Sequence, residues 1–283
     1  MPDVAYVTYA GADGTEDPDI DLPIALRALR ERGVSVVAVR WDDPSVDWAD
    51  YRLVLVRSTW DYTEHYADFL AWVRRVDAAT RIRNPLTTLE TNTDKRYLRE
   101  LEHAGIPIVP TTWVESTADL AAARLARIPS VVKPAVSAGA RDTVLAVDET
   151  AIHSQAEHIL TLGKPAMVQP YLAAVEHEGE VAVIVLGNQI SHAVRKVPPL
   201  TEGGHGDPSR PVVLDAELRG FAERVLGVVP NRSELVYARV DVVRNDNGQL
   251  VLMELELTEP LLFLGYDAGA PARFADAVVA ALP

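Results

Sequence analysis

The sequence predicts an α/β protein that begins with a small, largely parallel sheet. Two observations predict this class. Roughly the first 80 residues alternate between short Val-rich segments and longer amphipathic segments, which is the order of strands and helices in a parallel sheet. Later in the chain, apolar segments are paired across Gly187-Asn188 and Asn247-Gly248, and such dipeptides are typical of antiparallel hairpins.

The N-terminal unit is expected to contain strands at residues 4–10, 34–41 and 51–58 and helices at residues 21–33 and 63–76. Ligands gather at the carboxyl ends of the strands in such sheets. The turn at residues 8–13 and the segment 57–62 therefore lie beside a candidate substrate site. The candidate contacts there are Arg57, Ser58, Thr59 and Asp61. The segment is explained equally well as a helix entry that Ser58 or Thr59 caps.

A link at residues 81–85 leads to the second part of the chain. We expect a helix that Thr93 caps and that ends before Gly105. The remaining expected elements are a strand at 108–114, a helix at 117–128, two strands around a small-residue loop at 129–147, a helix at 149–163, a strand that breaks at Pro170, a hairpin at 179–197, a polar loop at 198–211, a helix at 215–229, a closing hairpin at 235–260 and a final helix at 272–282.

Composition excludes several classes of function. The formal charge of -14 argues against binding to nucleic acids or anionic membranes, which are themselves polyanions. The chain has no cysteine, so disulfides, thiolate catalysis and Cys-ligated metals are excluded. The N-terminus has no basic region typical of a signal peptide, and no apolar run reaches the roughly 18 residues of a membrane span. We expect a cytoplasmic protein with a small-molecule substrate, and a homo-oligomer is compatible with the sequence.

The closing hairpin carries an unusual set of charges. With Asn247-Gly248 as a two-residue turn, Asp241 lies opposite Glu254 and Arg239 lies opposite Glu256, all on one face. The other face is then apolar and consists of Val240, Val242, Val251, Met253, Leu255 and Leu257. Clustered carboxylates suit a hard cation such as Mg²⁺, which proteins usually hold with one or two carboxylates plus substrate phosphates. A solvated sheet face on which Arg239 neutralises the acids is an equally good explanation of the hairpin alone.

Further segments carry groups that could bind a nucleotide. Lys133 ends an apolar run before a small-residue loop, where an ammonium and backbone N–H groups could meet phosphates. Lys95 lies near the start of an expected helix. The strand that breaks at Pro170 could leave a backbone edge that reads an adenine, and Glu180 follows within reach of a ribose. Each feature taken alone is also explained as an ordinary surface lysine, turn or strand end.

Taken together and in order, these segments resemble the ATP-grasp superfamily, and most of all the bacterial glutathione synthetase type. The match covers roughly residues 84–260, with the motifs VVKP, QPYL, VRKVP and MELELTEP. The resemblance implies an N-terminal α/β substrate domain at residues 1–84. It also implies two α+β subdomains that clasp ATP, a central one at 85–169 with a Gly-containing loop and a C-terminal one at 170–283 with the metal site.

The resemblance also implies a role for individual residues. Residues that would contact ATP are Lys95, Lys133, Ser137, Gly139, Gln169, Tyr171, Leu172 and Glu180, with the lysines on the phosphates, the 137–140 loop closing over them and Glu180 on the ribose. Arg195 or Lys196 would stabilise the transferring phosphoryl group, and Arg239 could clamp a substrate carboxylate. Asp241, Glu254 and Glu256 would bind one or two Mg²⁺ ions, which Mn²⁺ could replace.

Two departures from the family argue against glutathione synthesis. The family usually has Asn at the position of Glu256, and a carboxylate there can still bind a metal. The synthetases have Ser at the position of Glu259, and residues 201–211 do not reproduce their glycine-rich substrate loop. His205 in this loop could act as a base, although an exposed loop histidine explains it better.

The resemblance implies an ATP-dependent ligase that joins a carboxylate and an amine through an acyl phosphate. The short chain suggests a small, amino-acid-like substrate. The chain is also similar to the stand-alone ATP-grasp cyclo-ligases of D-cycloserine biosynthesis, which implies intramolecular cyclisation of O-ureido-D-serine. An ATP-grasp small-molecule kinase and a non-catalytic nucleotide-binding regulatory protein are the alternatives, and only a ligase would yield a new amide.

Overall fold

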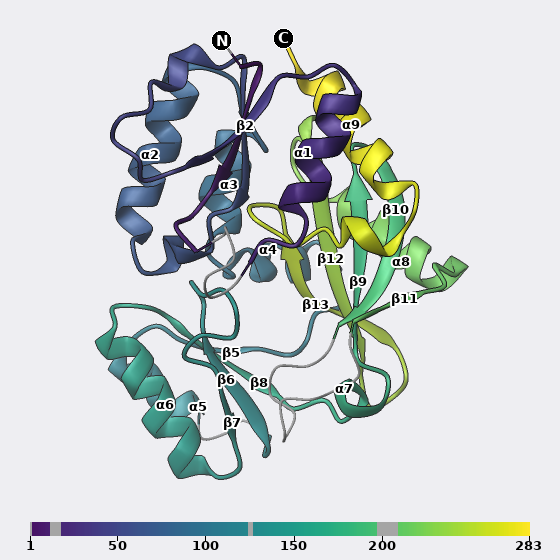
Figure 1. Ribbon diagram of the computed structural model, residues 1–283. Helices are drawn as coiled ribbons and strands as arrows, with labels where there is room; N and C mark the ends of the chain where they lie inside the picture. The colour runs from purple at the N-terminus through teal and green to yellow at the C-terminus, as the bar shows by residue number, and fades with distance from the viewer. Residues whose placement is uncertain (1, 12–17, 124–126, 197–208) are drawn as a thin grey trace.

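The computed structural model describes residues 2–11, 18–123, 127–196 and 209–283, which form three sheets with their covering helices (Figure 1). The N-terminal sheet is parallel throughout, as predicted, and has the order β2-β1-β3-β4. Its strands are β1 (Val4–Thr8), β2 (Val36–Arg40), β3 (Leu53–Ser58) and β4 (Ile82–Arg83). The sequence analysis missed β4, because a strand of two residues has no alternation to recognise.

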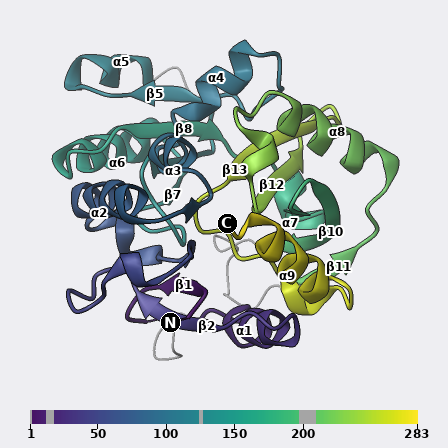
Figure 2. The same ribbon diagram turned by 90° about the horizontal axis from the view of Figure 1, so that it is seen from above.

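Helices cover both faces of the N-terminal sheet. Helix α2 (Tyr66–Ala79) packs on one face through Phe69 and Trp72, and α1 (Leu22–Glu31) packs on the other through Leu29. Burial on both faces explains why β1 and β3 are continuous apolar runs rather than alternating ones. Helix α9 (Ala270–Ala281) lies beside α1 in both views, which joins the two ends of the chain (Figures 1 and 2).

The central sheet is antiparallel and has the order β5-β8-β6-β7. Its strands are β5 (Thr112–Val114), β6 (Ser130–Pro134), β7 (Val144–Ala146) and β8 (Ala166–Pro170). Helices α5 (Leu120–Ala123) and α6 (Glu149–Thr161) cover this sheet and share one apolar core with it. The strand that precedes Tyr171 does end at Pro170, as the sequence predicted.

The C-terminal sheet is also antiparallel and has the order β11-β10-β9-β12-β13. Its strands are β9 (Glu180–Leu186), β10 (Gln189–Lys196), β11 (Arg210–Val212), β12 (Tyr237–Arg244) and β13 (Leu250–Glu256). Helices α4 (Tyr97–His103) and α8 (Ala216–Gly227) pack on one face, α9 packs on the other, and the short α7 (Ala174–His177) precedes β9. Pairing of Gln189 with Leu186 confirms the predicted hairpin at Gly187-Asn188.

The closing hairpin differs from its prediction at the turn. Asn247-Gly248 is not a two-residue turn, because Gly248 N–H donates to the Asn245 carbonyl at 2.8 Å and residues 246–248 form the loop. That loop would shift the pairing by one residue, but a β-bulge between Asp241 and Val242 shifts it back. The predicted pairs Asp241–Glu254 and Arg239–Glu256 are therefore confirmed.

The bulge also changes which face the apolar residues of β13 occupy. Leu252, opposite Val242, is fully buried in the core beneath the sheet. Val251 and Met253, which we predicted on this core face, instead pack with Val243 on the side of the carboxylates. Bulges are frequent beside functional sites, where they redirect side chains.

The predicted helix at 93–104 is wrong in its first turn. Helix α3 (Leu86–Asn92) ends at Asn92, with Thr93 as its C-cap, and α4 begins only at Tyr97. Thr93 caps no helix N-terminus, and its hydroxyl donates to the Leu89 carbonyl at 3.0 Å. Lys95 therefore lies between two helices, where its amide donates to the Ala135 carbonyl at 2.9 Å.

Asn84 connects the N-terminal unit to the C-terminal sheet. It is fully buried, its amide donates to the carbonyls of Tyr237 (2.9 Å) and Leu257 (2.6 Å), and its side-chain oxygen accepts from Val236 N–H at 2.8 Å.

Asn84→Ala would leave these three backbone groups buried without a partner. We expect a loss of about 3 kcal/mol in the free energy of unfolding, measured by urea denaturation. Asn84→Asp, which keeps one acceptor but loses both donors, should be destabilised as well, and wild-type stability in both variants would contradict this role.

Candidate active site

A cavity of about 620 Å³ is bounded by the central sheet, the C-terminal sheet and the end of β3. It brings together most of the predicted site residues. Those that line it are Lys95, Lys133, Ser137, Gly139, Gln169, Tyr171, Leu172, Glu180, Lys196, Arg239, Glu254 and Glu256. They come from both sheets and from the segments between them, so the cavity exists only in the folded arrangement of the two.

Six predicted residues do not line the cavity. Arg57, Ser58 and Thr59 are buried, and the Arg57 guanidinium lies 4.4 Å from the centre of the Tyr237 ring. Asp61 accepts a hydrogen bond from the indole of Trp41 at 2.8 Å. Arg195 donates to the His177 carbonyl at 2.9 Å, so of the two cations in VRKVP only Lys196 reaches the cavity. The sixth is Asp241, which is fully buried on β12. His205 and the loop 202–208 lie outside the described residues, as do residues 12 and 13 of the predicted turn.

The cavity is also lined by residues that were not among the individual candidates, two of them within the predicted segment 57–62. Trp60 and Tyr62, from the 3-10 turn after β3, take the place that we expected for their polar neighbours. Asn92, Arg141, Thr143, Met253 and Phe263 line it as well, together with Glu259, which had been noted only as a departure from the family. The aromatic pair was visible in the sequence, but nothing there indicated which side chains of the turn would face the cavity.

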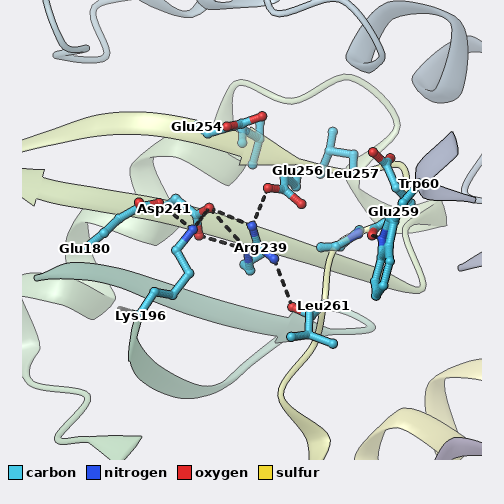
Figure 3. Close-up of polar contacts among 12 residues, drawn as sticks. Trp60, Glu180, Lys196, Arg239, Asp241, Glu254, Glu256, Leu257, Glu259 and Leu261 are labelled. Atoms are coloured by element: carbon cyan, nitrogen blue, oxygen red, sulfur yellow. Dashed lines mark hydrogen bonds and ion pairs between the residues drawn. The ribbon is translucent and has the colours of Figure 1, made fainter. Parts of the chain in front are cut away.

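An ion-pair network surrounds Asp241 (Figure 3). Its carboxylate accepts from Arg239 Nε at 2.9 Å and from Lys196 Nζ at 2.6 Å. Lys196 also pairs with Glu180 at 2.5 Å, and Arg239 pairs with Glu256 and donates to the Leu261 carbonyl. Burial alone would raise the pKa of Asp241, but the two cations outweigh it and lower that pKa to about 2.

Arg239 thus has most of its donors occupied inside the protein, which favours a positioning role over a free clamp for a substrate. Arg239→Met would leave Asp241 and Glu256 with less compensation for their buried charge. We expect it to lower the free energy of unfolding by about 3–5 kcal/mol. Arg127→Met is the matched control, because its pair with Asp246 is exposed and should contribute at most about 1 kcal/mol. Equal effects of the two changes in urea denaturation would contradict the account.

Lys95 and Lys133, the two lysines predicted to contact phosphates, differ in their partners. Lys95 pairs with Glu254 at 3.1 Å and donates to the Ser137 carbonyl at 2.6 Å, which holds it beside the 137–140 loop. The Lys133 ammonium forms no hydrogen bond or ion pair with any residue in the described part of the chain, although its backbone is paired in β6, and burial lowers its pKa. Burial disfavours the ionised form of Glu254 too, but Lys95 and Lys133 outweigh it and lower the pKa of this carboxyl.

The carboxylates fit a metal only in part. Among the residues that the structure describes, no group of three or more His, Cys, Asp or Glu side chains is arranged to hold a metal ion. Asp241 is taken up by Arg239 and Lys196, so the predicted set of three is not assembled. Glu254 and Glu256 do line the cavity. Two carboxylates together with phosphate oxygens are a usual ligand set for Mg²⁺, so the residues present fit a metal that binds with the nucleotide.

Two acids have a pKa well above the usual range. Burial raises the pKa of Glu256 to about 7 against the opposing effect of Arg239. Burial and the charge of Glu256 raise the pKa of Glu259 to about 8. Both side chains line the cavity, so a cation that binds there would favour the ionised form that burial disfavours in these two carboxyl groups.

Known proteins resemble this chain over nearly its whole length. Residues 4–84 match the family described as the N-terminal domain of the D-cycloserine synthetase DcsG. The cycloserine biosynthesis protein DcsG of Streptomyces lavendulae is 32% identical, covering 92% of this chain and 93% of that protein. The crystal structure of D-cycloserine synthetase DcsG has a TM-score of 0.88 and 30% identity and covers 99% of each chain.

More distant structures share the fold alone. A RimK domain ATP-grasp protein from Sphaerobacter thermophilus has a TM-score of 0.69 at 21% identity, covering 98% of this chain and 99% of that one. The ATP-grasp ligase PsnB, complexed with a precursor peptide and AMPPNP, has a TM-score of 0.64 at 18% identity, covering 100% and 98%. No described helix is long and apolar enough to cross a membrane. The predicted ATP-grasp fold and the ligase class are confirmed: the chain is an ATP-dependent ligase and belongs to the DcsG family.

Proposed function

We propose that this enzyme cyclises O-ureido-D-serine to D-cycloserine at the expense of ATP. The observation that carries the proposal is the cavity itself, in which three lysines and four glutamates converge in a chain 32% identical to a cycloserine biosynthesis protein over 92% of its length. The cations suit the phosphates of ATP, and the carboxylates suit the divalent cation that accompanies them.

We assign ATP to the side of the cavity between the central sheet and β13. Lys95 and Lys133 contact the phosphates, and residues 137–140, including Ser137 and Gly139, close over them. The adenine lies against residues 169–172. The Gln169 amide already donates to the Thr111 hydroxyl at 2.9 Å, which supports recognition by the backbone of Tyr171 and Leu172 rather than by this side chain.

Glu180 and Lys196 form an ion pair at the wall of the cavity, and we assign them to the ribose and to the transferring phosphoryl group. Glu254 and Glu256 would hold Mg²⁺, or Mn²⁺ in its place. When bound, such an ion neutralises charge on the phosphate oxygens. Arg239 keeps Glu256 in position. This division matches an N-terminal substrate domain at 1–84 and ATP-binding subdomains at 85–169 and 170–283. A cytoplasmic location, where ATP is available, follows from this reaction.

The proposed reaction balances as follows. The substrate carboxylate attacks the γ-phosphorus, ADP leaves, and an acyl phosphate forms. The oxygen-bound nitrogen of the ureido group attacks the acyl carbon, the C–O bond to phosphate breaks, the nitrogen loses its proton to the departing phosphate, and the ring closes. Loss of the carbamoyl group to water releases carbon dioxide and ammonia. Lys133 and Lys196 neutralise charge that develops on the phosphoryl oxygens, and the cavity holds the two ends of one substrate close together.

Product analysis tests the proposal. The purified enzyme, ATP, Mg²⁺ and O-ureido-D-serine should yield ADP, phosphate and D-cycloserine in equal amounts, measured by mass spectrometry and a phosphate assay. A phosphorylated product without a new amide would identify a kinase reaction instead. Absence of ADP with this substrate would overturn the proposed substrate.

A further inference from the structure

Glu259 differs from the other carboxylates of the cavity. Glu180, Glu254 and Glu256 each form an ion pair, with Lys196, Lys95 and Arg239 respectively. Glu259 lines the same cavity and is only 8% exposed, yet it forms no ion pair with any residue in 2–11, 18–123, 127–196 or 209–283. In Figure 3 it lies with Trp60 to one side of the network around Arg239.

The backbone around Glu259 is fixed by the N-terminal unit. The Trp60 indole donates to the Glu259 carbonyl at 3.0 Å, and Arg57 donates to the next carbonyl, that of Pro260, at 2.6 Å. On the other side of Glu259, the Tyr237 hydroxyl donates to the Thr258 carbonyl at 2.9 Å. The segment thus cannot easily move its carboxylate out into solvent, and the position of this acid is built into the fold.

A buried carboxylate without a counter-ion is unfavourable unless something compensates it. Because Glu259 lines the cavity, a cationic group of a bound ligand could compensate its charge. Trp60 and Tyr62 line the same cavity, and Trp60 lies beside Glu259 in Figure 3. Aromatic faces beside an acid are a favourable environment for an organic ammonium group. A metal fits less well beside Glu259, because Trp60 and Tyr62 add no carboxylate ligand there.

We propose that Glu259, together with Trp60 and Tyr62, binds the α-ammonium group of the substrate and makes the enzyme selective for amino acids. This assignment rests on the proposed function, because it places a zwitterionic substrate in the cavity. The substrate then lies between Glu259 at its ammonium end and the phosphate side of the cavity at its carboxylate end.

The test compares two substrates in three proteins. The substrates are O-ureido-D-serine and its counterpart without the amino group, 3-(ureidooxy)propanoate, and the readout is kcat/KM for ADP formation. In Glu259→Gln, kcat/KM for O-ureido-D-serine should fall by about 100-fold, mainly through KM, while the value for the amine-free compound stays unchanged. Glu157→Gln, which changes an exposed glutamate on α6, should behave as wild type with both compounds.

The outcomes separate this assignment from the proposed function. Equal losses for both compounds in Glu259→Gln, or no loss for either, would overturn the ammonium site even if the wild type makes D-cycloserine. Absence of ADP formation by the wild type with O-ureido-D-serine would overturn the proposed function and this assignment with it. Calorimetry should give the same ATP affinity for wild type and variant. If Glu259→Gln does not fold, Glu259→Asp replaces it, and it should keep part of the preference for the amino compound.

Discussion

Replacing Glu254 by glutamine is expected to lower ADP formation by about 1,000-fold while leaving the fold intact. Glu254 lines the cavity close to Lys95 and Lys133. Burial disfavours its ionised form, but these two lysines outweigh burial and lower its pKa, so the carboxylate is ionised at neutral pH. Glutamine has the same shape but lacks the charge that a divalent cation needs. Turnover is measured at saturating ATP and Mg²⁺, with circular dichroism to verify folding.

Glu157→Gln is the matched control for this change, since it removes a glutamate of equal size that lies exposed on α6. It should retain wild-type turnover. Full activity of Glu254→Gln would remove this residue from the metal site and leave its ion pair with Lys95 as its main role.

Lys133→Met is expected to weaken ATP binding by about 100-fold, which is about 2.7 kcal/mol. Lys133 has no ion pair with a described residue, and burial lowers its pKa, so its ammonium gains most when phosphate oxygens arrive. Methionine fills a similar volume, so stability should not fall. Calorimetric titration with ATP and Mg²⁺ gives the affinity.

Lys164→Met is the control for Lys133→Met, because Lys164 does not line the cavity. Its ATP affinity should equal that of the wild type. If the two variants bind ATP equally well, Lys133 is not a phosphate ligand and the placement of the nucleotide must be revised.

The pairing of charged residues on the closing hairpin was predicted correctly from the sequence, although the turn on which the prediction relied was wrong. The predicted register needed a two-residue turn, whereas the chain has a three-residue loop and a compensating bulge at Asp241 and Val242. The bulge depends on packing that no local pattern encodes. The predicted partners of Glu254 and Glu256, which are Asp241 and Arg239, are confirmed. The predicted faces of Val251 and Met253 are wrong.

The substrate end of the cavity was much less predictable. Strand periodicity locates the carboxyl end of β3, but it does not say that Arg57 turns inward to the Pro260 carbonyl or that Trp60 and Tyr62 line the cavity. These contacts join segments about 200 residues apart in the sequence. Only the docking of the N-terminal unit on the C-terminal sheet creates them.

Unpaired charges were the least visible feature in the sequence and are the most informative in the structure. Lys133 and Glu259 both face the cavity, and neither forms an ion pair within the part of the chain that is described. One is suited to phosphates and the other to an ammonium group. Other cations that line the cavity, Lys196 and Arg239, are compensated by the carboxylates of Glu180 and Asp241, and these ion pairs hold the site in shape.

The proposed reaction depends on activation of the substrate carboxylate by ATP as an acyl phosphate. The most direct test uses O-ureido-D-serine labelled with ¹⁸O in its carboxylate, followed by mass spectrometry of the released phosphate. Each phosphate should carry one ¹⁸O atom from the substrate, because the bond that breaks on ring closure is the acyl C–O bond. Phosphate that contains no ¹⁸O would contradict it and show that ATP is cleaved without activating the carboxylate.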